Sequence, residues 1–507
     1  MSDDFGAMSV TAYRRLAGRF RRWSALREAA FLLQWDSEVM MPAGGASARS
    51  EQNAALELAG HGLLAAPEID DLLTAAEADR TGLDNWENAN LAEMRRLQIH
   101  ATALDADLVA ALSKASSACT DAWHRVKVSG SFTDLRPVFA EVVHLNRLAA
   151  QAKAEEFGCL PFEALMDQWE PGARIAEIDH LFDDYAAFAP DFIAEVKEHQ
   201  AHQAPAITTA GPFDRDRQKA LGERIMAGLG FDFRHGRLDT SLHPFSTETP
   251  SDVRITTGYQ DDDFLLTSLP GILHETGHAL YEQNLPHAWR LQPVGRSRGM
   301  SLHESQSLLI ENQLYRHPAF CRYLSPLANQ TFPGHEAAFE PANIHRLLTR
   351  INPSARRFEA DEVTYPLHVI LRYRLERALI DGQLTVADLP GAWNDGIRDL
   401  LGVEVRHDGE GCLQDIHWYT VYWGYFPCYA VGAMIAAQLF DAASRALPDL
   451  EQAIAVGDFT GLRSWLTQHI HSEGASRPMA EMLRDASDQA LNPAFFRRHL
   501  RRQYLST

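Results

Sequence analysis

Apolar residues recur at helical spacing from about residue 8 to residue 240, where Ala, Leu, Glu and Arg are abundant and strand-like alternation is rare. Residues three and four apart lie on one face of a helix, so the pattern predicts a succession of amphipathic helices. Its breaks at 42–45, 170–172 and 204–212 are short and do not resemble flexible linkers. We therefore expect residues 1–507 to form a single domain.

One segment departs from the helical pattern. In 252–257, β-branched residues alternate with polar ones, which is the periodicity of a strand, and Asp252, Arg254 and Thr256 would share one face. A second extended piece is expected at 403–406. The pattern predicts an all-α, mostly helical fold with one small β-sheet near the candidate site.

The stretch from Trp418 to Phe440 has no charged side chain and is nominally long enough to span a membrane. It also contains four tyrosines, Gln438, two glycines and Pro427, which indicate a buried turn followed by a core helix. We expect no membrane span.

The formal net charge of −21 argues against nucleic acid or an anionic membrane as a partner, because both favour a basic surface. The arginine-rich runs at 14–27 and 497–502 are interpreted as solvated helix faces. Five cysteines without a C-x-x-C pair are typical of reduced thiols, and the acidic start does not resemble a secretory signal. These features predict a cytoplasmic protein.

The candidate chemistry begins with His274-Glu275-Thr276-Gly277-His278. On a helix, the two histidines lie one turn apart on one face, and Glu275 projects beside them. Two imidazoles can bind one metal ion while the carboxylate lies close enough to take a proton from an attacking water molecule. An H-E-x-x-H also arises by chance in a chain with 22 histidines, so the rest of the sequence must decide.

A catalytic zinc ion usually has three protein ligands and one open position. We assign the third ligand to Glu304, which lies 304 − 278 = 26 residues after His278 and is followed by the apolar run 308–310. This spacing leaves room for one loop and the start of a second helix. An isolated glutamate would more simply be an exposed helix carboxylate, but its position after an H-E-x-x-H favours a ligand.

Five motifs follow one another along the chain. They are D-x-R-x-T at 252–256, H-E-T-G-H at 274–278, H-E-S-Q at 303–306, R-R-x-x-A-D at 356–361 and G-x-x-Q-D-x-H-W at 411–418. In this order they resemble the signatures of the carboxypeptidase Taq family of metallocarboxypeptidases, and the similarity spans nearly the entire chain. The family usually has isoleucine at the position of Arg356.

The resemblance implies that His274, His278 and Glu304 bind the metal and that Glu275 is the general base and acid, the four residues already indicated by spacing. It also implies an all-helical body with two lobes on either side of a long central cleft, similar to neurolysin, and commonly a homodimer. Zinc is the default ion for these ligands, and cobalt or manganese could replace it.

Removal of a C-terminal residue requires a cation that recognises the free carboxylate, which a guanidinium does with paired hydrogen bonds. The resemblance points to Arg357 as this anchor and to Arg254 as a second contact or a positioning residue. The alternative for each is a structural salt bridge, Arg254 with Asp252 and Arg357 with Asp361.

The helical pattern places Arg357 on one stripe with Arg372, and Pro366 is expected to kink that helix. The second guanidinium, Arg356, leaves open which arginine binds the carboxylate.

Attack of water on a peptide carbonyl builds negative charge on its oxygen, which a hydrogen-bond donor stabilises. His417 and Tyr425 are the candidates for this role. The alternatives are a core histidine and a packing aromatic residue.

Together these observations predict a metallocarboxypeptidase of broad specificity that releases single residues from peptides with a free C-terminus. Two other functions stay open at this point. One is an oligopeptidase that cleaves internal bonds with the same metal site, and the other is a helical scaffold whose metal site is vestigial.

Overall fold

The computed structural model describes residues 2–78, 80–420 and 422–505. Within them the chain is mostly helical and contains one two-stranded sheet, which confirms the predicted fold class. The chain divides into two compact units. The first comprises 1–101, 205–349 and 435–491, and the second comprises 102–204, 350–434 and 492–507.

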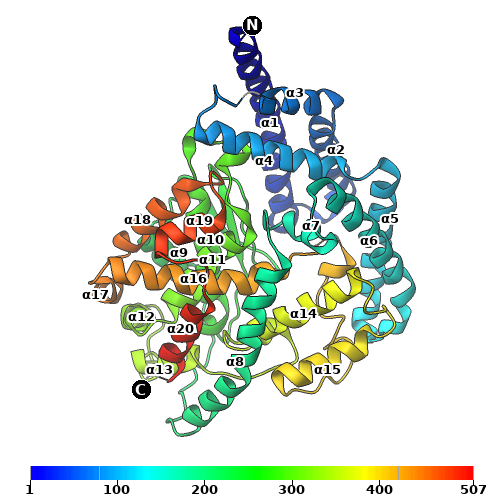
Figure 1. The fold of residues 1–507 in the computed structure, drawn as a ribbon. Coiled ribbons are helices and arrows are strands. Elements are labelled where there is room, and N and C mark those ends of the chain that lie inside the picture. Colours follow the sequence, from blue (N-terminus) through cyan, green and yellow to red (C-terminus); the bar gives the residue numbers. More distant parts are fainter. Residues whose placement is uncertain (1, 79, 421, 506–507) are drawn as a thin grey trace. The chain divides into compact units, whose positions relative to one another are not determined.

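The first unit contains most of the helices drawn in blue, green and orange to red (Figure 1). Its helices are α1 (Ser2–Val39), α2 (Ala46–Leu64), α3 (Pro67–Ala78), α4 (Asn85–Thr102), α9 (Arg215–Leu229), α10 (Leu269–Gln283), α11 (Gly299–Leu308), α12 (Pro318–Thr331), α13 (Pro341–Leu348), α17 (Leu450–Val456), α18 (Thr460–His469) and α19 (Met479–Ser487).

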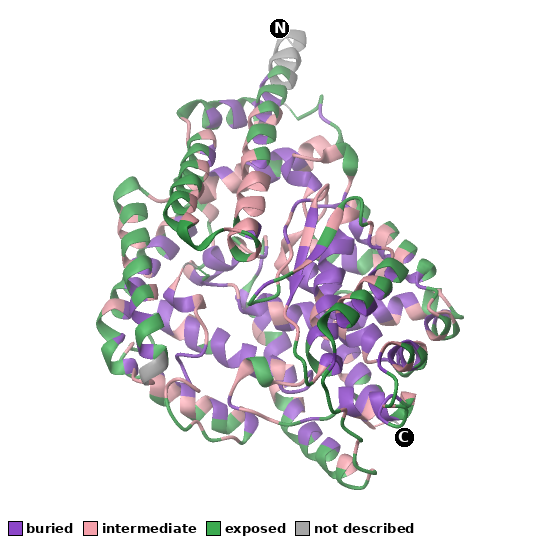
Figure 2. Ribbon diagram, turned by 180° about the vertical axis from the view of Figure 1, so that it is seen from behind, coloured by how far each residue is buried: buried purple, intermediate pink, exposed green. Residues whose placement is uncertain are grey.

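Apolar side chains at helical spacing hold α1, α3 and α4 together. Leu16 and Phe20 of α1, Leu73 of α3 and Leu91 of α4 are fully buried in one cluster. The colouring in Figure 2 shows the same division elsewhere, with buried and exposed residues alternating along single helices. Burial of one helical face is therefore what the sequence periodicity encodes.

The sheet pairs β1 (Gly236–Thr240) with β2 (Val253–Thr257) in parallel. The predicted strand at 252–257 is confirmed, with Arg237 opposite Arg254. The extended segment expected at 403–406 is not a strand, because its backbone pairs with no neighbouring strand in the described chain. The second strand is instead β1, whose Gly236 and Asp239 give a weak strand signal.

The second unit is also helical. Its helices are α5 (Ala106–Ser129), α6 (Arg136–Phe157), α7 (Pro161–Asp167), α8 (Ile175–Ala201), α14 (Tyr365–Ile380), α15 (Leu389–Leu401) and α20 (Pro493–Leu505), and α16 (Pro427–Ala446) begins here and ends in the first unit.

Helix α14 begins later than the sequence pattern predicts. Pro366 lies in its first turn, where the missing N–H removes no helical hydrogen bond, so this proline starts the helix instead of kinking it. Arg357 lies before the helix, in the 3-10 turn Arg357–Glu359. The expected helical stripe from Arg357 to Arg372 is therefore wrong.

The described part of the uncharged stretch, 418–420 and 422–440, forms a turn followed by most of α16, and its residues are largely buried. In the described chain, no helix combines the length and apolar character needed to cross a membrane.

Candidate active site

Helix α10 carries the H-E-x-x-H segment. Pro270 lies in its first turn, and the imidazoles of His274 and His278 follow one turn apart with ring centroids 5.0 Å apart and planes at 80°. Glu275 lies between them in the sequence and is only 6% exposed. The helix therefore presents two nitrogen ligands and a buried carboxylate, as predicted.

The third ligand comes from α11, which approaches α10 closely at Gly277. A Cβ atom on Gly277 would lie 2.3 Å from the carbonyl oxygen of Gln306 and 2.5 Å from the Cα atom of Ser307. Glycine is therefore required for this approach. The approach places Glu304 Oε2 3.9 Å from His274 Nε2 and 3.4 Å from His278 Nε2.

Both imidazoles are held by a contact at the second ring nitrogen. His274 Nδ1 lies 2.8 Å from Oε2 of Glu311, and His278 Nδ1 lies 3.1 Å from the carbonyl oxygen of His303. A carboxylate or carbonyl acceptor at Nδ1 keeps the hydrogen there and leaves Nε2 free to bind a metal. Glu311 belongs to the π-helical turn Leu309–Tyr315, which continues directly from α11.

The donor set fits a divalent metal ion. One ligand atom each of His274, His278 and Glu304 lies within 4.8 Å of the other two, and two imidazoles with one carboxylate form a usual catalytic zinc set. Burial opposes charge on His274, but Glu304 and Glu311 raise its pKa to about 10. The carboxylates therefore favour positive charge at this point, which a metal ion would supply in place of the proton.

Glu275 is suited to proton transfer. Burial raises its pKa to about 7, and Glu304 adds to this effect while His274 opposes it. A carboxylate with a pKa near neutrality can both accept and return a proton.

Arg254 lies on β2 in the same unit as the metal ligands. Its Nε and Nη2 atoms donate to Asp252 at 3.1 and 2.7 Å, and its Cζ lies 4.2 Å from the ring centroid of Trp35. The predicted partner Asp252 is thus present. Thr256, expected on the same face, accepts a hydrogen bond from the Ser241 hydroxyl at 2.7 Å.

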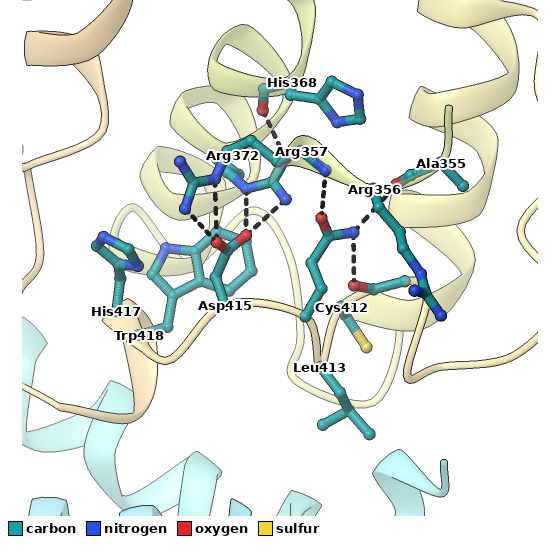
Figure 3. A network of polar contacts seen from close by, with 12 residues as sticks. Ala355, Arg356, Arg357, His368, Arg372, Cys412, Leu413, Asp415, His417 and Trp418 are labelled. Carbon is teal, nitrogen blue, oxygen red and sulfur yellow. Dashed lines mark hydrogen bonds and ion pairs between the residues drawn. The ribbon is translucent and has the colours of Figure 1, made fainter. Parts of the chain in front are cut away.

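Arg357 lies in the second unit, in a network around Asp415 (Figure 3). Its Nε and Nη2 atoms donate to Asp415 Oδ1 at 3.0 and 2.7 Å, and Nη1 donates to the Tyr365 hydroxyl at 2.9 Å. Arg372, which is fully buried, donates from Nε to the other oxygen of Asp415 at 2.7 Å. Arg357 therefore forms its ion pair with Asp415 and not with Asp361.

The charges of this network stabilise one another. Burial opposes ionisation of Asp415, but Arg372 and Arg357 hold its pKa well below the usual range. Two guanidinium groups share one carboxylate, so the group carries one net positive charge. The more exposed partner is Arg357, with 17% of its side chain accessible against 0% for Arg372.

Arg356 points away from this network (Figure 3). Its terminal nitrogens lie 3.3 Å from Glu359 and 3.7 Å from Glu410. These carboxylates neutralise Arg356, so Arg357 is the arginine better placed for carboxylate recognition.

His417 and Tyr425 also lie in the second unit, with ring centroids 6.1 Å apart. His417 Nε2 lies 3.4 Å from the hydroxyl of Tyr429. Burial, with the nearby Arg357 and Arg372, lowers the pKa of His417 to about 4, although Asp415 opposes this shift. The imidazole is therefore neutral near pH 7.

With this geometry established, the chain can be compared with known proteins. The sequence model of the carboxypeptidase Taq (M32) metallopeptidases matches residues 15–504. The chain belongs to this family.

Relatives in the carboxypeptidase Taq family match over nearly their whole length. Thermostable carboxypeptidase 1 of Pyrococcus furiosus is 31% identical, with 97% of this chain and 98% of the relative covered. The solved structure of Trypanosoma cruzi metallocarboxypeptidase 1 is 37% identical and has a TM-score of 0.96. The match covers 98% of this chain and 100% of that one. The M32 carboxypeptidase of Deinococcus radiodurans has a TM-score of 0.92 at 32% identity, with coverage of 97% of this chain and 99% of that one. The chain is thus a metallocarboxypeptidase with a His-His-Glu metal site.

Sequence reasoning did not identify several residues around these groups. Glu311 lies 311 − 304 = 7 residues after Glu304. This spacing of two helical turns places both carboxylates on one helix face and was the available signal. Asp415 stands within the carboxypeptidase Taq motif at 411–418, but nothing in the sequence linked it to Arg357. Tyr365 and Tyr429 had no signal, because their roles depend on tertiary contacts.

Proposed function

We propose that this carboxypeptidase uses a zinc ion at His274, His278 and Glu304 to release single residues from peptides with a free C-terminus. The arrangement of Arg357 supports the exopeptidase activity. Its three hydrogen bonds to Asp415 and Tyr365 use three of the five guanidinium N–H groups, which leaves one on Nη1 and one on Nη2. That pair matches the two oxygens of a carboxylate.

A bound zinc ion would supply Lewis acidity at the scissile carbonyl and at the attacking water. Glu275 removes the proton from that water and delivers it to the leaving amine. His417 and Tyr425 are proposed as donors to the carbonyl oxygen as negative charge develops there. Arg254, fixed by Asp252 and Trp35, is proposed as a second substrate contact or a positioning residue.

The exopeptidase proposal is tested with an unstructured peptide and its C-terminal amide, with products followed by mass spectrometry. We expect a ladder of single-residue losses from the free peptide, abolished by a chelator, and little cleavage of the amide. Undiminished cleavage of the amide would instead indicate an endo-acting oligopeptidase.

Two adjacent arginines supply a matched pair of variants. Loss of a charged hydrogen-bond pair costs about 1.5–3 kcal/mol, so Arg357→Gln should raise KM by about 10- to 150-fold. Arg356→Gln, which loses contacts with Glu359, Glu410 and the Phe358 ring, should leave KM within about twofold. Equal effects of the two substitutions would refute the assignment of Arg357 as the anchor.

The metal and the base are tested separately. Metal analysis of the purified protein should give one zinc ion per chain. Cobalt or manganese in place of zinc would change the identity of the ion and leave the proposed ligands unchanged. Glu275→Gln should retain the metal and lose activity. A variant that keeps its activity would exclude Glu275 as the base.

The single-domain organisation, the central cleft, the homodimer and the cytoplasmic location stay predictions. Sedimentation velocity tests the homodimer directly, because a monomer at micromolar concentration would contradict it.

A further inference from the structure

Tyr429 contacts Arg357, His417 and Tyr425, the three residues of the second unit that the proposed function assigns to substrate recognition and charge stabilisation. It lies in the first turn of α16 and is half-buried. Its ring lies against Arg357, with the guanidinium carbon 5.4 Å from the ring centroid. Its hydroxyl lies 3.4 Å from Nε2 of His417.

Tyr429 is one of three aromatic residues that lie around the guanidinium of Arg357. The rings of Tyr365 and Phe426 lie 5.8 and 6.0 Å from the same guanidinium carbon, and Tyr365 meets Tyr429 edge-to-face at 6.2 Å. Aromatic faces attract a cation without consuming its N–H groups. The rings therefore restrict the guanidinium while leaving its two remaining donors for a carboxylate.

The contact with His417 holds the hydroxyl group of Tyr429. Nδ1 of this imidazole is buried and has no hydrogen-bond partner in the described chain, so the Tyr429 hydroxyl is the polar contact seen at the ring. A neutral imidazole carries one N–H. The proposed donor role of His417 requires this hydrogen on Nε2, because Nδ1 is buried, and in that tautomer Nε2 faces the tyrosine oxygen at 3.4 Å and would share its hydrogen with the carbonyl oxygen.

A tyrosine side chain is rigid beyond its two rotatable bonds, so its ring and hydroxyl keep a fixed separation. We propose that Tyr429 is a positioning residue that sets the separation between Arg357 and His417, so that one amino-acid residue fits between the bound carboxylate and the scissile carbonyl. The proposal rests on the proposed function, because Arg357 must bind the carboxylate and His417 must lie at the carbonyl. It explains how single-residue release would be enforced from within the second unit.

The experiment compares Tyr429→Phe with Tyr429→Leu on free-C-terminal peptides. Tyr429→Phe keeps the ring beside Arg357 and the ring contact with His417 at 6.3 Å, and it removes the hydroxyl contact with His417, so kcat should fall by about 2- to 10-fold while KM stays within about twofold. Tyr429→Leu also removes the ring, so KM should rise and dipeptides should appear among the products.

Tyr422→Phe is the matched control. Its ring lies 6.0 Å from that of His417 and is 42% exposed, whereas the rings seen around the Arg357 guanidinium are those of Tyr365, Phe426 and Tyr429. We expect wild-type kcat, KM and products from this variant. The same loss of kcat in Tyr422→Phe and Tyr429→Phe would overturn the proposal, because removal of any hydroxyl in the aromatic cluster would then suffice.

Wild-type kcat in Tyr429→Phe would also overturn the proposal, as would strictly single-residue release with unchanged KM in Tyr429→Leu. These outcomes are separable from failure of the proposed function. That failure appears in the wild-type enzyme as cleavage of the amidated peptide, or in Arg357→Gln as an unchanged KM.

Discussion

Glu311 Oε2 lies 2.8 Å from Nδ1 of His274, while Nε2 of the same ring lies 3.9 Å from Glu304. The imidazole is thus held between a carboxylate that orients it and a carboxylate that can share its metal. Such outer contacts fix the tautomer of a ligating histidine and increase its basicity.

Substitution Glu311→Gln should weaken metal binding by about 10- to 100-fold, because the acceptor at Nδ1 loses its charge. Competition with a chromophoric chelator measures the dissociation constant. Glu223→Gln on α9, which removes a carboxylate 3.9 Å from Lys219, is the control and should bind metal like the wild type. Equal affinities of the two variants would contradict the orienting role of Glu311.

The close approach of α10 and α11 makes Gly277 sensitive to the smallest substitution. In Gly277→Ala the new methyl group would meet the backbone at Gln306 and Ser307, which must shift, and such overpacking costs about 1–3 kcal/mol or more. We expect a lower Tm and weaker metal binding. Gly271→Ala in the same helix is the control, since its nearest contact is the Thr257 hydroxyl at 3.3 Å. If the Tm of Gly277→Ala is no lower than that of Gly271→Ala, α10 and α11 can move apart without loss of stability.

Asp415 neutralises a buried charge as well as holding Arg357. Asp415→Asn leaves the fully buried Arg372 without its counter-ion, and breaking such a pair costs about 3–5 kcal/mol. We expect a clear fall in Tm and a higher KM. Asp395→Asn, which removes one of the two exposed carboxylates beside Arg398, should change neither.

A second change separates stability from binding in this network. Combining Asp415→Asn with Arg372→Met removes the uncompensated charge of Arg372 and returns the network to one net positive charge, so Tm should recover. KM should stay high, because Arg357 still lacks its carboxylate. Recovery of KM in the double variant would show that Asp415 serves folding alone.

The buried carboxyl of Glu376 gives a pH-dependent stability. Burial raises its pKa from 4.5 to about 8, although the Gly424 amide and the Trp418 indole favour the carboxylate. Between these values the folded protein holds a proton that the unfolded chain has lost. The contribution of Glu376 is therefore complete below about pH 4.5 and is lost as the pH rises through about 8.

Melting curves of wild type and Glu376→Gln between about pH 5 and about pH 9 test this linkage. The wild type should lose up to about 1.4 kcal/mol per pH unit relative to the variant, which has no proton to lose. A difference in Tm that does not vary with pH would show that Glu376 is ionised throughout this range.

The fold class and the metal ligands could be predicted because their signals are local. Helical periodicity, the two histidines one turn apart, and a glutamate at helix–loop–helix spacing all lie within short stretches of sequence. Residues joined only by tertiary contacts could not be found in this way. Asp415 lies 58 residues from Arg357, and helical spacing suggested Asp361 as its partner instead.

The boundaries of α14 caused that error. Periodicity carried the helix back to Arg357, whereas the structure begins it at Tyr365 with Pro366 in the first turn. A proline near the start of a helical pattern indicates an N-terminus as readily as a kink, and the sequence does not distinguish them.

The residues that hold the metal lie between His274 and Glu311, and those around the proposed carboxylate anchor lie between Arg357 and Tyr429. These stretches of the gene do not overlap. The metal ligands and the proposed carboxylate anchor are therefore encoded in separate stretches, and a substitution in one stretch need not alter the other. A descendant without Arg357 would keep its metal ligands. With a different substrate contact in place of the carboxylate anchor, it could cleave internal peptide bonds.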